Sequence, residues 1–556
     1  MRIPDWRHSP SWWLIAASLL PPSAAAQMVG TCPGAQGEAY LDVGNVRARI
    51  LNNGGLFWRG EPHVYEVPRG SGLHAGFATS IWVGGLVVGE LRMAGTRYGE
   101  WEFWPGPLDA AGNPPADCLH YNRLWEVTRD DVERYHTTGE VTENLRAWPW
   151  PLGAPVVDGD GDPANYNLDG GDRPELLGDQ MLWWVMNDQG NTHESTDTEP
   201  LGLEVHGSAF AYFHPRSYLD HTTFYRFKLY YKGREPLDDT WIGFFVDVDL
   251  GNFRDDYVGS DTTLHLGYTY NGDNEDEGDR GYGISPPAVG YTFLRTPVAR
   301  NERDNDRDGS VDEPGEMLGM THFLVYSGGG CVFCDPSTGQ DYYYYLQARW
   351  KDGKPLTVGG DYGRDFSRIP TTFSLPGDPV TGTFWSALNT DGAGGILDPA
   401  DVQFVMSTGP FTMQPGDEQE VLFAIVWSRG DDHLDSVRRL KQDVARLRAV
   451  AEDLLVPTLP EPETVPPPSF PLGFTQNHPN PFRESTTIRY SLPQAMHVRL
   501  TVYDVLGREV AVLVDRRQEA GAYTVDFEAG SLPAGVYLYR VEMDRLAATK
   551  TMMLVR

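Results

Sequence analysis

The chain has 556 residues, with 78 acidic and 45 basic side chains and a formal net charge of −33 at pH 7. This charge argues against a protein that binds nucleic acid or an anionic membrane, because such a protein needs a basic face. The 61 glycines, 42 prolines and 12% aromatic residues predict an all-β, multi-domain protein with many turns, and a hydrophobic fraction of 40% is enough to form cores.

The first 26 residues have the pattern of a secretory signal peptide. Arg2 and Arg7 give a basic start, Trp12–Leu20 is a short apolar run, and small residues precede Gln27. The apolar run is too short for a permanent membrane span, although a buried helix or a retained anchor is the alternative. No later run approaches about 18 apolar residues, so we expect an exported chain without a transmembrane anchor.

We expect the body to contain a β-rich region over 27–200 with an acidic loop, followed by a central β-sandwich region over 201–432 with calcium-type loops. Turn residues predict a hairpin over Asn45–Trp58, and alternating apolar residues predict half-buried antiparallel strands such as Thr222–Tyr231.

Two further segments follow the β-rich body. A helix is predicted over 433–455, because apolar residues recur there at helical spacing from Leu434 to Leu455. Six prolines between Leu454 and Ser469 then predict a stiff, extended linker over 456–472.

An exported chain with four cysteines is expected to form disulfides. The simplest pairing joins Cys32 to Cys118 and Cys331 to Cys334. A redox-active Cys-X-X-Cys site and a zinc site are the two alternatives, and the sequence does not fix the connectivity.

The first acidic cluster resembles the front of a calcium loop. Carboxylates at alternate positions can wrap one cation, and Gly309 permits the sharp turn. Position 12 of the loop is Gly315 rather than Glu, so the cluster is not a true EF-hand, and we expect a structural calcium ion rather than a sensor. A solvated acidic turn is the alternative. The expected ligands are Asp304, Asp306, Asp308, Ser310 through its carbonyl, Asp312 and Glu313.

Two more clusters are candidate calcium sites. The second contains Asp158, Asp160 and Asp162, followed by Asp169 and Asp172. The third lies at a strand end, where convergent carboxylates are costly without a cation or strong hydrogen bonds. The sequence does not decide whether this cluster binds a metal ion or another polar ligand. The third cluster contains Asp247, Asp249, Asp255, Asp256 and Asp261.

Local catalytic signatures are absent from the sequence: it has no HExxH, no GxSxG, no phosphate loop and no dinucleotide fingerprint. Tryptophans suit either sugar stacking or a sandwich core, and acids are so numerous that some pair always suits a glycosidase. The tryptophans concerned are Trp148, Trp150, Trp183 and Trp184. No catalytic or cofactor-binding residue is predicted; calcium is the one cofactor expected, and a non-enzymatic role is favoured.

The last 84 residues, 473–556, form a separate module with ten basic and nine acidic side chains. Short strands punctuated by turns at about 10-residue spacing predict an immunoglobulin-like sandwich. The expected strands are 486–491, 498–503, 510–514, 523–527, 536–541 and 549–555.

This module resembles the type A sorting domain of the type IX secretion system. The matching segments, in order, are Gln476–Phe482, Ile488–Pro493, Val502–Val510, Leu532–Tyr537 and Lys550–Arg556. The resemblance implies that the type IX machinery is a partner of residues 473–556 and carries the chain across the outer membrane of a Gram-negative bacterium. It also implies later attachment to surface polysaccharide or release.

Three body segments, Gly178–Asp188, Asp255–Asp261 and Ser407–Gly416, resemble large secreted proteins that carry the same sorting domain and have no assigned activity. The sequence therefore predicts a secreted or cell-surface protein, stabilised by calcium, with a structural, adhesive or binding role. The alternative is a secreted hydrolase or carbohydrate-binding protein that acts on polysaccharide.

Overall fold

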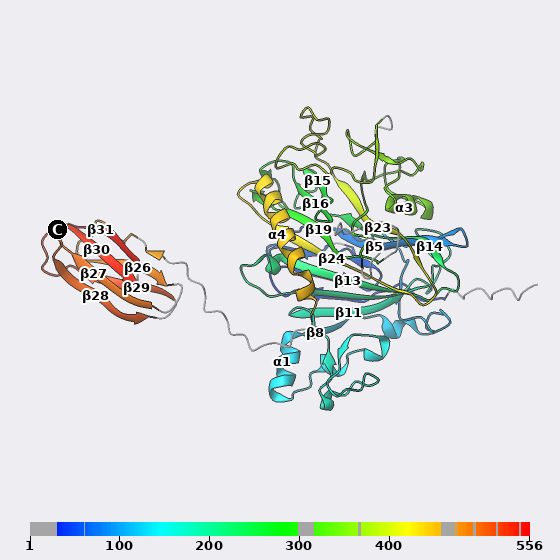
Figure 1. Ribbon diagram of the computed structural model, residues 1–556, viewed down its shortest axis with the longest axis horizontal. Helices are drawn as coiled ribbons and strands as arrows, with labels where there is room; N and C mark the ends of the chain where they lie inside the picture. Colours follow the sequence, from blue (N-terminus) through cyan, green and yellow to red (C-terminus); the bar gives the residue numbers. More distant parts are fainter. Residues whose placement is uncertain are drawn as a thin grey trace, which may run out of the picture. The chain divides into compact units, whose positions relative to one another are not determined.

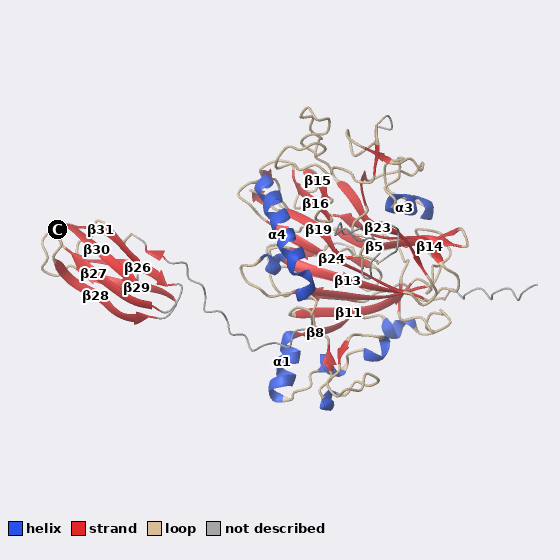
Figure 2. Cartoon of the chain, in the orientation of Figure 1, coloured by secondary structure: helices blue, strands red, loops and turns tan. Residues whose placement is uncertain are grey.

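The computed structural model describes residues 30–60, 62–298, 316–364, 368–456, 473–474, 476–492, 496–518, 521–543 and 546–555. The expected signal peptide and nearly all of the expected linker lie outside these residues. The chain forms two compact units, Met1–Thr458 and Leu459–Arg556, and strands dominate both of them (Figures 1 and 2). The predicted all-β, multi-domain class is confirmed.

One nine-stranded sheet of the first unit, sheet A, runs in the order β1-β2-β3-β5-β14-β23-β20, with β4 paired to β2 and β6 paired to β5. Its strands are β1 (Glu38–Leu41), β2 (Arg47–Leu51), β3 (Gly55–Leu56), β4 (Tyr65–Glu66), β5 (Ala78–Val87), β6 (Glu90–Gly95), β14 (Leu237–Asp247), β20 (His322–Ser327) and β23 (Val402–Met413). The expected first hairpin is present as β2 and β3. Strands β5 and β6 form another hairpin, whose two turn residues, Val88 and Gly89, both have positive φ.

The other nine-stranded sheet, sheet B, runs in the order β15-β16-β19-β24-β13-β12-β11-β7, with β8 paired to β11. Its strands are β7 (Trp104–Pro105), β8 (Trp125–Thr128), β11 (Gln180–Asn187), β12 (Leu203–Ala211), β13 (Thr222–Tyr231), β15 (Asp256–Asp261), β16 (Leu266–Asn271), β19 (Ala288–Arg295) and β24 (Glu418–Ser428). Both sheets therefore draw strands from both sides of residue 200.

Smaller elements complete this unit. The short strand pairs are β9 (Val156–Val157) with β10 (Arg173–Pro174), β17 (Glu275–Asp276) with β18 (Gly283–Ile284), and β21 (Leu356–Thr357) with β22 (Pro370–Thr371). The helices are α1 (Arg129–Thr138), α2 (Glu143–Arg146), α3 (Gly339–Leu346) and α4 (His433–Leu454), and the short 3₁₀ helices are η1 (Cys118–Tyr121), η2 (Trp150–Leu152), η3 (Leu168–Gly170) and η4 (Tyr218–His221).

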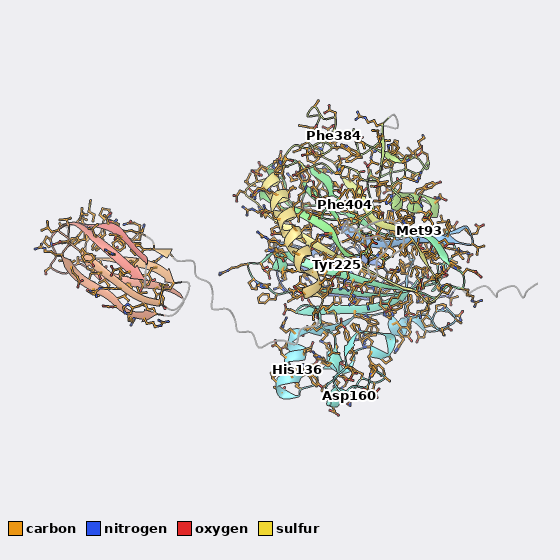
Figure 3. All side chains as sticks on the ribbon, viewed as in Figure 1. Met93, His136, Asp160, Tyr225, Phe384 and Phe404 are labelled. Atoms are coloured by element: carbon orange, nitrogen blue, oxygen red, sulfur yellow. A yellow bond between two sulfur atoms is a disulfide. The ribbon has the colours of Figure 1, made fainter. Side chains whose placement is uncertain are left out.

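Sheets A and B pack face to face over a shared aromatic core. Phe244 of β14 lies 4.4 Å from Phe423 of β24, measured between ring centroids, and Tyr225 of β13 lies 5.0 Å from Phe423. Figure 3 labels Tyr225 and Phe404, two residues of this core from opposite sheets. The first unit is therefore a β-sandwich.

Helices cover the outer face of each sheet, as Figure 1 shows for α4 and α3. The apolar side of α4 packs against β16, β19 and β24 of sheet B, and α3 packs against sheet A. The expected half-buried alternation is present in the second half of β13, but every residue of β14 from Thr240 to Asp247 is buried. The physical reason is a second layer, since α3 packs on the outer face of β14 and removes the solvated face that alternation predicts. Strands β11 and β12 are also buried throughout, and the segment that holds Val132, Leu145 and Trp148 shares an apolar cluster with β11.

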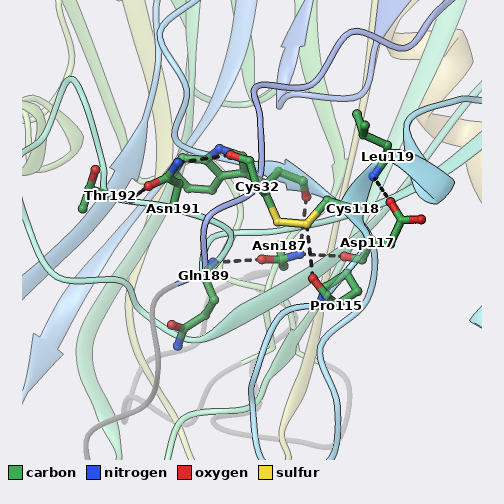
Figure 4. Close-up of a disulfide and its surroundings, with 11 residues drawn as sticks. Cys32, Pro115, Asp117, Cys118, Leu119, Asn187, Gln189, Asn191 and Thr192 are labelled. Carbon is green, nitrogen blue, oxygen red and sulfur yellow. Dashed lines mark hydrogen bonds between the residues drawn. A yellow bond between two sulfur atoms is a disulfide. The ribbon is translucent and has the colours of Figure 1, made fainter.

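Two disulfides lie in the first unit, Cys32–Cys118 and Cys331–Cys334, in the simplest of the predicted pairings. The first joins residues 86 positions apart (Figure 4). Cys32 N–H donates to the Gly190 carbonyl at 2.8 Å, and Asn191 Nδ2 donates to the Cys32 carbonyl at 3.1 Å. The disulfide fastens the N-terminal segment to η1, and the hydrogen bonds fasten it to the loop that follows β11.

The second unit is a small sandwich of two sheets, β25-β26-β29 and β28-β27-β30-β31, which enclose their own apolar core. All six expected strands are present. The strands are β25 (Gly473–Phe474), β26 (Ser485–Leu492), β27 (Met496–Tyr503), β28 (Glu509–Gln518), β29 (Gly521–Glu528), β30 (Gly535–Met543) and β31 (Leu546–Leu554).

Candidate metal centres

Three carboxylates meet where β14 ends and β23 begins. Each of Asp247, Asp249 and Asp401 offers an oxygen atom, and these atoms all lie within 4.8 Å of one another. Asp247 is the last residue of β14 and pairs with Gln403 of β23. The end of one strand therefore meets the start of its antiparallel neighbour. We call Asp247, Asp249, Asp401 and Gln403 centre 1.

Two enclosed oxygen atoms of centre 1 lack a hydrogen-bond donor. Asp247 Oδ2 accepts a hydrogen bond from the Tyr98 hydroxyl at 2.8 Å, but Asp247 Oδ1 has no partner. Gln403 Nε2 donates to Asp401 Oδ1 at 3.0 Å, which leaves Gln403 Oε1 without a partner. Asp247 is only 5% exposed and Gln403 only 4%. Buried polar atoms of this kind are costly unless a donor or a cation meets them.

The electrostatics of centre 1 favour a positive ion. Burial, followed by the charges of Asp249 and Asp401, holds the pKa of Asp247 well above its usual value. Burial and the charge of Asp335 also raise the pKa of Asp401. Within the described residues, neither Asp247 nor Asp401 forms an ion pair with Lys or Arg, and Arg97, which precedes Tyr98, pairs with Asp335 at 2.5 Å. A bound cation would supply the missing charge and keep both carboxyls ionised.

Backbone geometry turns Asp249 toward this centre. Its φ is 30°, in the left-handed region that residues with a side chain seldom occupy. The next residue, Leu250, donates its N–H to Asp256 Oδ2 at 3.0 Å, which fixes the loop after β14.

The second predicted cluster forms a compact exposed loop. Asp158 and Asp160 meet Asp172 within 4.8 Å, whereas Asp162 is not part of this group. Both oxygens of Asp172 accept backbone hydrogen bonds, from Gly159 at 2.9 Å and from Asn167 at 2.6 Å. Figure 3 labels Asp160 at the periphery of the body. Because backbone N–H groups of the loop already bind both Asp172 oxygens, these oxygens do not need a cation as the unpaired oxygens of centre 1 do.

The third predicted cluster separates into three places. Asp247 and Asp249 belong to centre 1, and Asp255 and Asp256 lie at the start of β15. Asp261 instead binds Lys441 of α4 at 3.3 Å and accepts hydrogen bonds from Thr263 and Leu264. The structure therefore does not bring Asp261 to the other carboxylates.

The remaining predicted sites are the calcium loop and the four tryptophans considered for sugar stacking. The expected calcium loop over 304–313 lies outside the described residues. Trp148, Trp183 and Trp184 are all at most 2% exposed, and Trp150 is half-buried. Three of the four tryptophans considered for sugar stacking therefore pack inside the body.

Residues 477–555 match the family model described as "Secretion system C-terminal sorting domain". The chain carries a secretion-system sorting domain. This domain indicates export through the type IX system to the cell surface or the surroundings, with the secretion machinery as a partner. Within the described residues, no helix is long and apolar enough to cross a membrane.

Comparisons over the body add little. No curated protein sequence matches the chain. Among solved structures, a polysaccharide lyase is 8% identical with a TM-score of 0.18, over 72% of this chain and 42% of that one. Dimeric latent PorU from Porphyromonas gingivalis is 11% identical with a TM-score of 0.14, over 68% of this chain and 31% of that one. The chain spans less than half of either protein, and neither overlap defines the fold of the body.

Proposed function

We propose that this exported protein is stabilised by calcium and has a structural, adhesive or binding role outside the cell. The observation that carries the proposal is centre 1, where the enclosed Asp247 Oδ1 and Gln403 Oε1 lie without donors beside two further carboxylates. Calcium takes six to eight oxygen ligands, which are typically carboxylate and carbonyl oxygens and water. The atoms of centre 1 that could bind a metal ion are all oxygen atoms, so the centre suits calcium.

An ion at centre 1 would stabilise the body by linking separate chain segments. It would link the end of β14, the loop that follows it and the start of β23, and it would remove the repulsion among the three carboxylates. The gain follows mass action, with about 2.7 kcal/mol for calcium at 100 times its dissociation constant. Attachment to surface polysaccharide after export, as the sorting-domain resemblance implies, is part of the same proposal.

Metal analysis and thermal unfolding of the complete chain test this proposal. We expect bound calcium in the purified protein and a body unfolding temperature that falls by a few degrees in EGTA, because chelation removes the mass-action term. Asp247→Asn, which keeps the side-chain size, should lose most of this EGTA response. The exposed Asp279→Asn is the matched control and should respond like the wild type. The proposal is refuted if the purified protein contains no metal and its unfolding temperature is the same with and without EGTA.

A further inference from the structure

A second pair of enclosed oxygens lies on sheet B, at the paired ends of β15 and β16. Asp256, the first residue of β15, is directly opposite Asn271, the last residue of β16. Directly opposed residues of an antiparallel pair share one face of the sheet. Asp256 is 4% exposed and Asn271 is fully buried.

Hydrogen bonds fix both side chains and leave one oxygen of each without a donor. Asp256 Oδ2 accepts the Leu250 N–H at 3.0 Å, whereas Oδ1 has no partner. Asn271 Nδ2 donates to the carbonyls of Asp273 at 3.2 Å and Glu275 at 3.3 Å, which sets the orientation of the amide. Asn271 Oδ1 is then left without a donor. An ionised Asp256 carboxylate cannot hydrogen-bond to the Asn271 amide oxygen, because both are acceptors.

Two more carboxyl groups, those of Asp255 and Asp276, lie near enough for their charges to act on Asp256. Both oxygens of Asp255 are enclosed without a donor. Asp276 is positioned by the N–H groups of Asn252 and Tyr282, at 3.1 and 2.7 Å.

Gly251 allows the Asp276 carboxylate to lie close to the backbone of the loop after β14. A Cβ at residue 251 would lie 2.1 Å from Asp276 Oδ2, and the φ of Gly251 is +66°. Any side chain there would have to displace the carboxylate, so the loop needs glycine at this position.

We propose that Asp255, Asp256 and Asn271 form a second site for a hard divalent cation, specifically calcium, with the hydrogen-bonded carboxylate of Asp276 outside the ligand set; we call it centre 2. The inference rests on the proposed function, because it takes calcium to be the ion that this exported body meets. Carboxylate and amide oxygens are the ligands calcium prefers. Asn271 was not a candidate in the sequence, and it adds a neutral oxygen that a purely acidic cluster lacks.

Centre 2 has a mechanical consequence that differs from that of centre 1. Besides the bond from Leu250 to its side chain, Asp256 accepts the Ala400 N–H at its carbonyl at 3.2 Å. Leu250 follows β14 and Ala400 precedes β23, so both contacts come from chain segments of sheet A. An ion at Asp256 would therefore tie the edge hairpin β15–β16 of sheet B to sheet A.

Calcium titration by calorimetry, with metal analysis of the complete chain, tests centre 2. We expect Asp255→Asn and Asp256→Asn each to bind one calcium ion fewer than the wild type. Asp256→Asn should also unfold at least as high as the wild type in EGTA, because the new amide can donate to Asn271 Oδ1. Asp255 is half-buried, so Asp255→Asn keeps the test valid if the Asp256 variant does not fold.

The outcomes separate the two hypotheses. Asp279→Asn, an exposed acid in the same loop region, should keep the wild-type stoichiometry. If the wild type binds calcium but Asp255→Asn and every folded Asp256 variant bind the same number of ions as the wild type, centre 2 is refuted while centre 1 stands. If Asp247→Asn loses one ion and Asp255→Asn loses a different one, so that the double variant loses two, both centres are supported. A wild type that binds no calcium refutes both.

Discussion

At the scale of single residues, His193 is buried as a charged group. Its Nδ1 lies 2.8 Å from the Met93 carbonyl and its Nε2 lies 2.9 Å from the Asp188 carbonyl. Both ring nitrogens face acceptors, so both need a proton, and only imidazolium carries two. Burial opposes this charge, but the neighbouring Glu102 and Asp188 outweigh burial and raise the pKa of His193 to about 9.

This arrangement predicts a loss of stability in alkali. The pKa of His193 is higher in the folded state than the usual unfolded value of about 6.5. Its contribution is therefore complete below pH 6.5 and is lost as pH rises through about 9. Between pH 7 and 10 the wild type should lose more stability than His193→Gln, as measured by urea unfolding. His214→Gln, at an exposed position, should follow the wild type, and equal slopes for all three proteins would contradict the assignment.

The proposed metal ligands show how far sequence reasoning reaches at this scale. The sequence places Asp247 and Asp249 in one candidate cluster at a strand end, because they are close in sequence, and the structure brings both into centre 1. Asp401 and Gln403 were missed because they lie about 150 residues later, and only the pairing of β14 with β23 brings them near. Asn271 was missed for the same reason, since its partner Asp256 is opposite it across a strand pair. No local spacing records such contacts.

At the scale of elements, α4 anchors the outer layer of sheet B. Four residues of its expected apolar stripe, Val437, Leu440, Val444 and Leu447, are fully buried, whereas Leu434 is partly buried and Val450 is exposed. Leu440→Ala should lower the free energy of unfolding by about 2–5 kcal/mol, since it opens a cavity that the two rigid layers cannot close. Val450→Ala on the same helix, at a position 36% exposed, should change it by less than about 1 kcal/mol. Similar losses for both variants in urea unfolding would show that α4 is only loosely packed.

Not every element could be expected from its own sequence. The stripe of α4 repeats over six turns, so periodicity identifies it. In contrast, α3 spans only Gly339–Leu346 and contains four consecutive tyrosines, which are weak helix formers. It forms because Tyr342 and Tyr345 pack on sheet A, and that contact is a tertiary effect. Fully buried strands escaped prediction for a related reason, because the layer that covers them comes from distant segments.

At the scale of the whole molecule, the two units differ in charge and have separate cores. The sorting domain is nearly neutral, whereas the first unit carries almost all of the net charge of −33. Among the residues that the structure describes, the apolar core of the sorting domain consists of residues from Phe474 onward. Each unit therefore has the buried surface that it needs to fold as a cooperative block.

Calorimetry of the complete chain should accordingly show two unfolding transitions. Removal of residues 473–556 should abolish one transition and leave the unfolding temperature of the other unchanged within about 1 °C, because additivity holds for parts that share no core. EGTA should lower only the transition that survives this truncation, since both proposed calcium centres lie in the first unit. If truncation lowers that transition, or if EGTA shifts the sorting domain instead, either the independence of the units or the placement of the calcium is wrong.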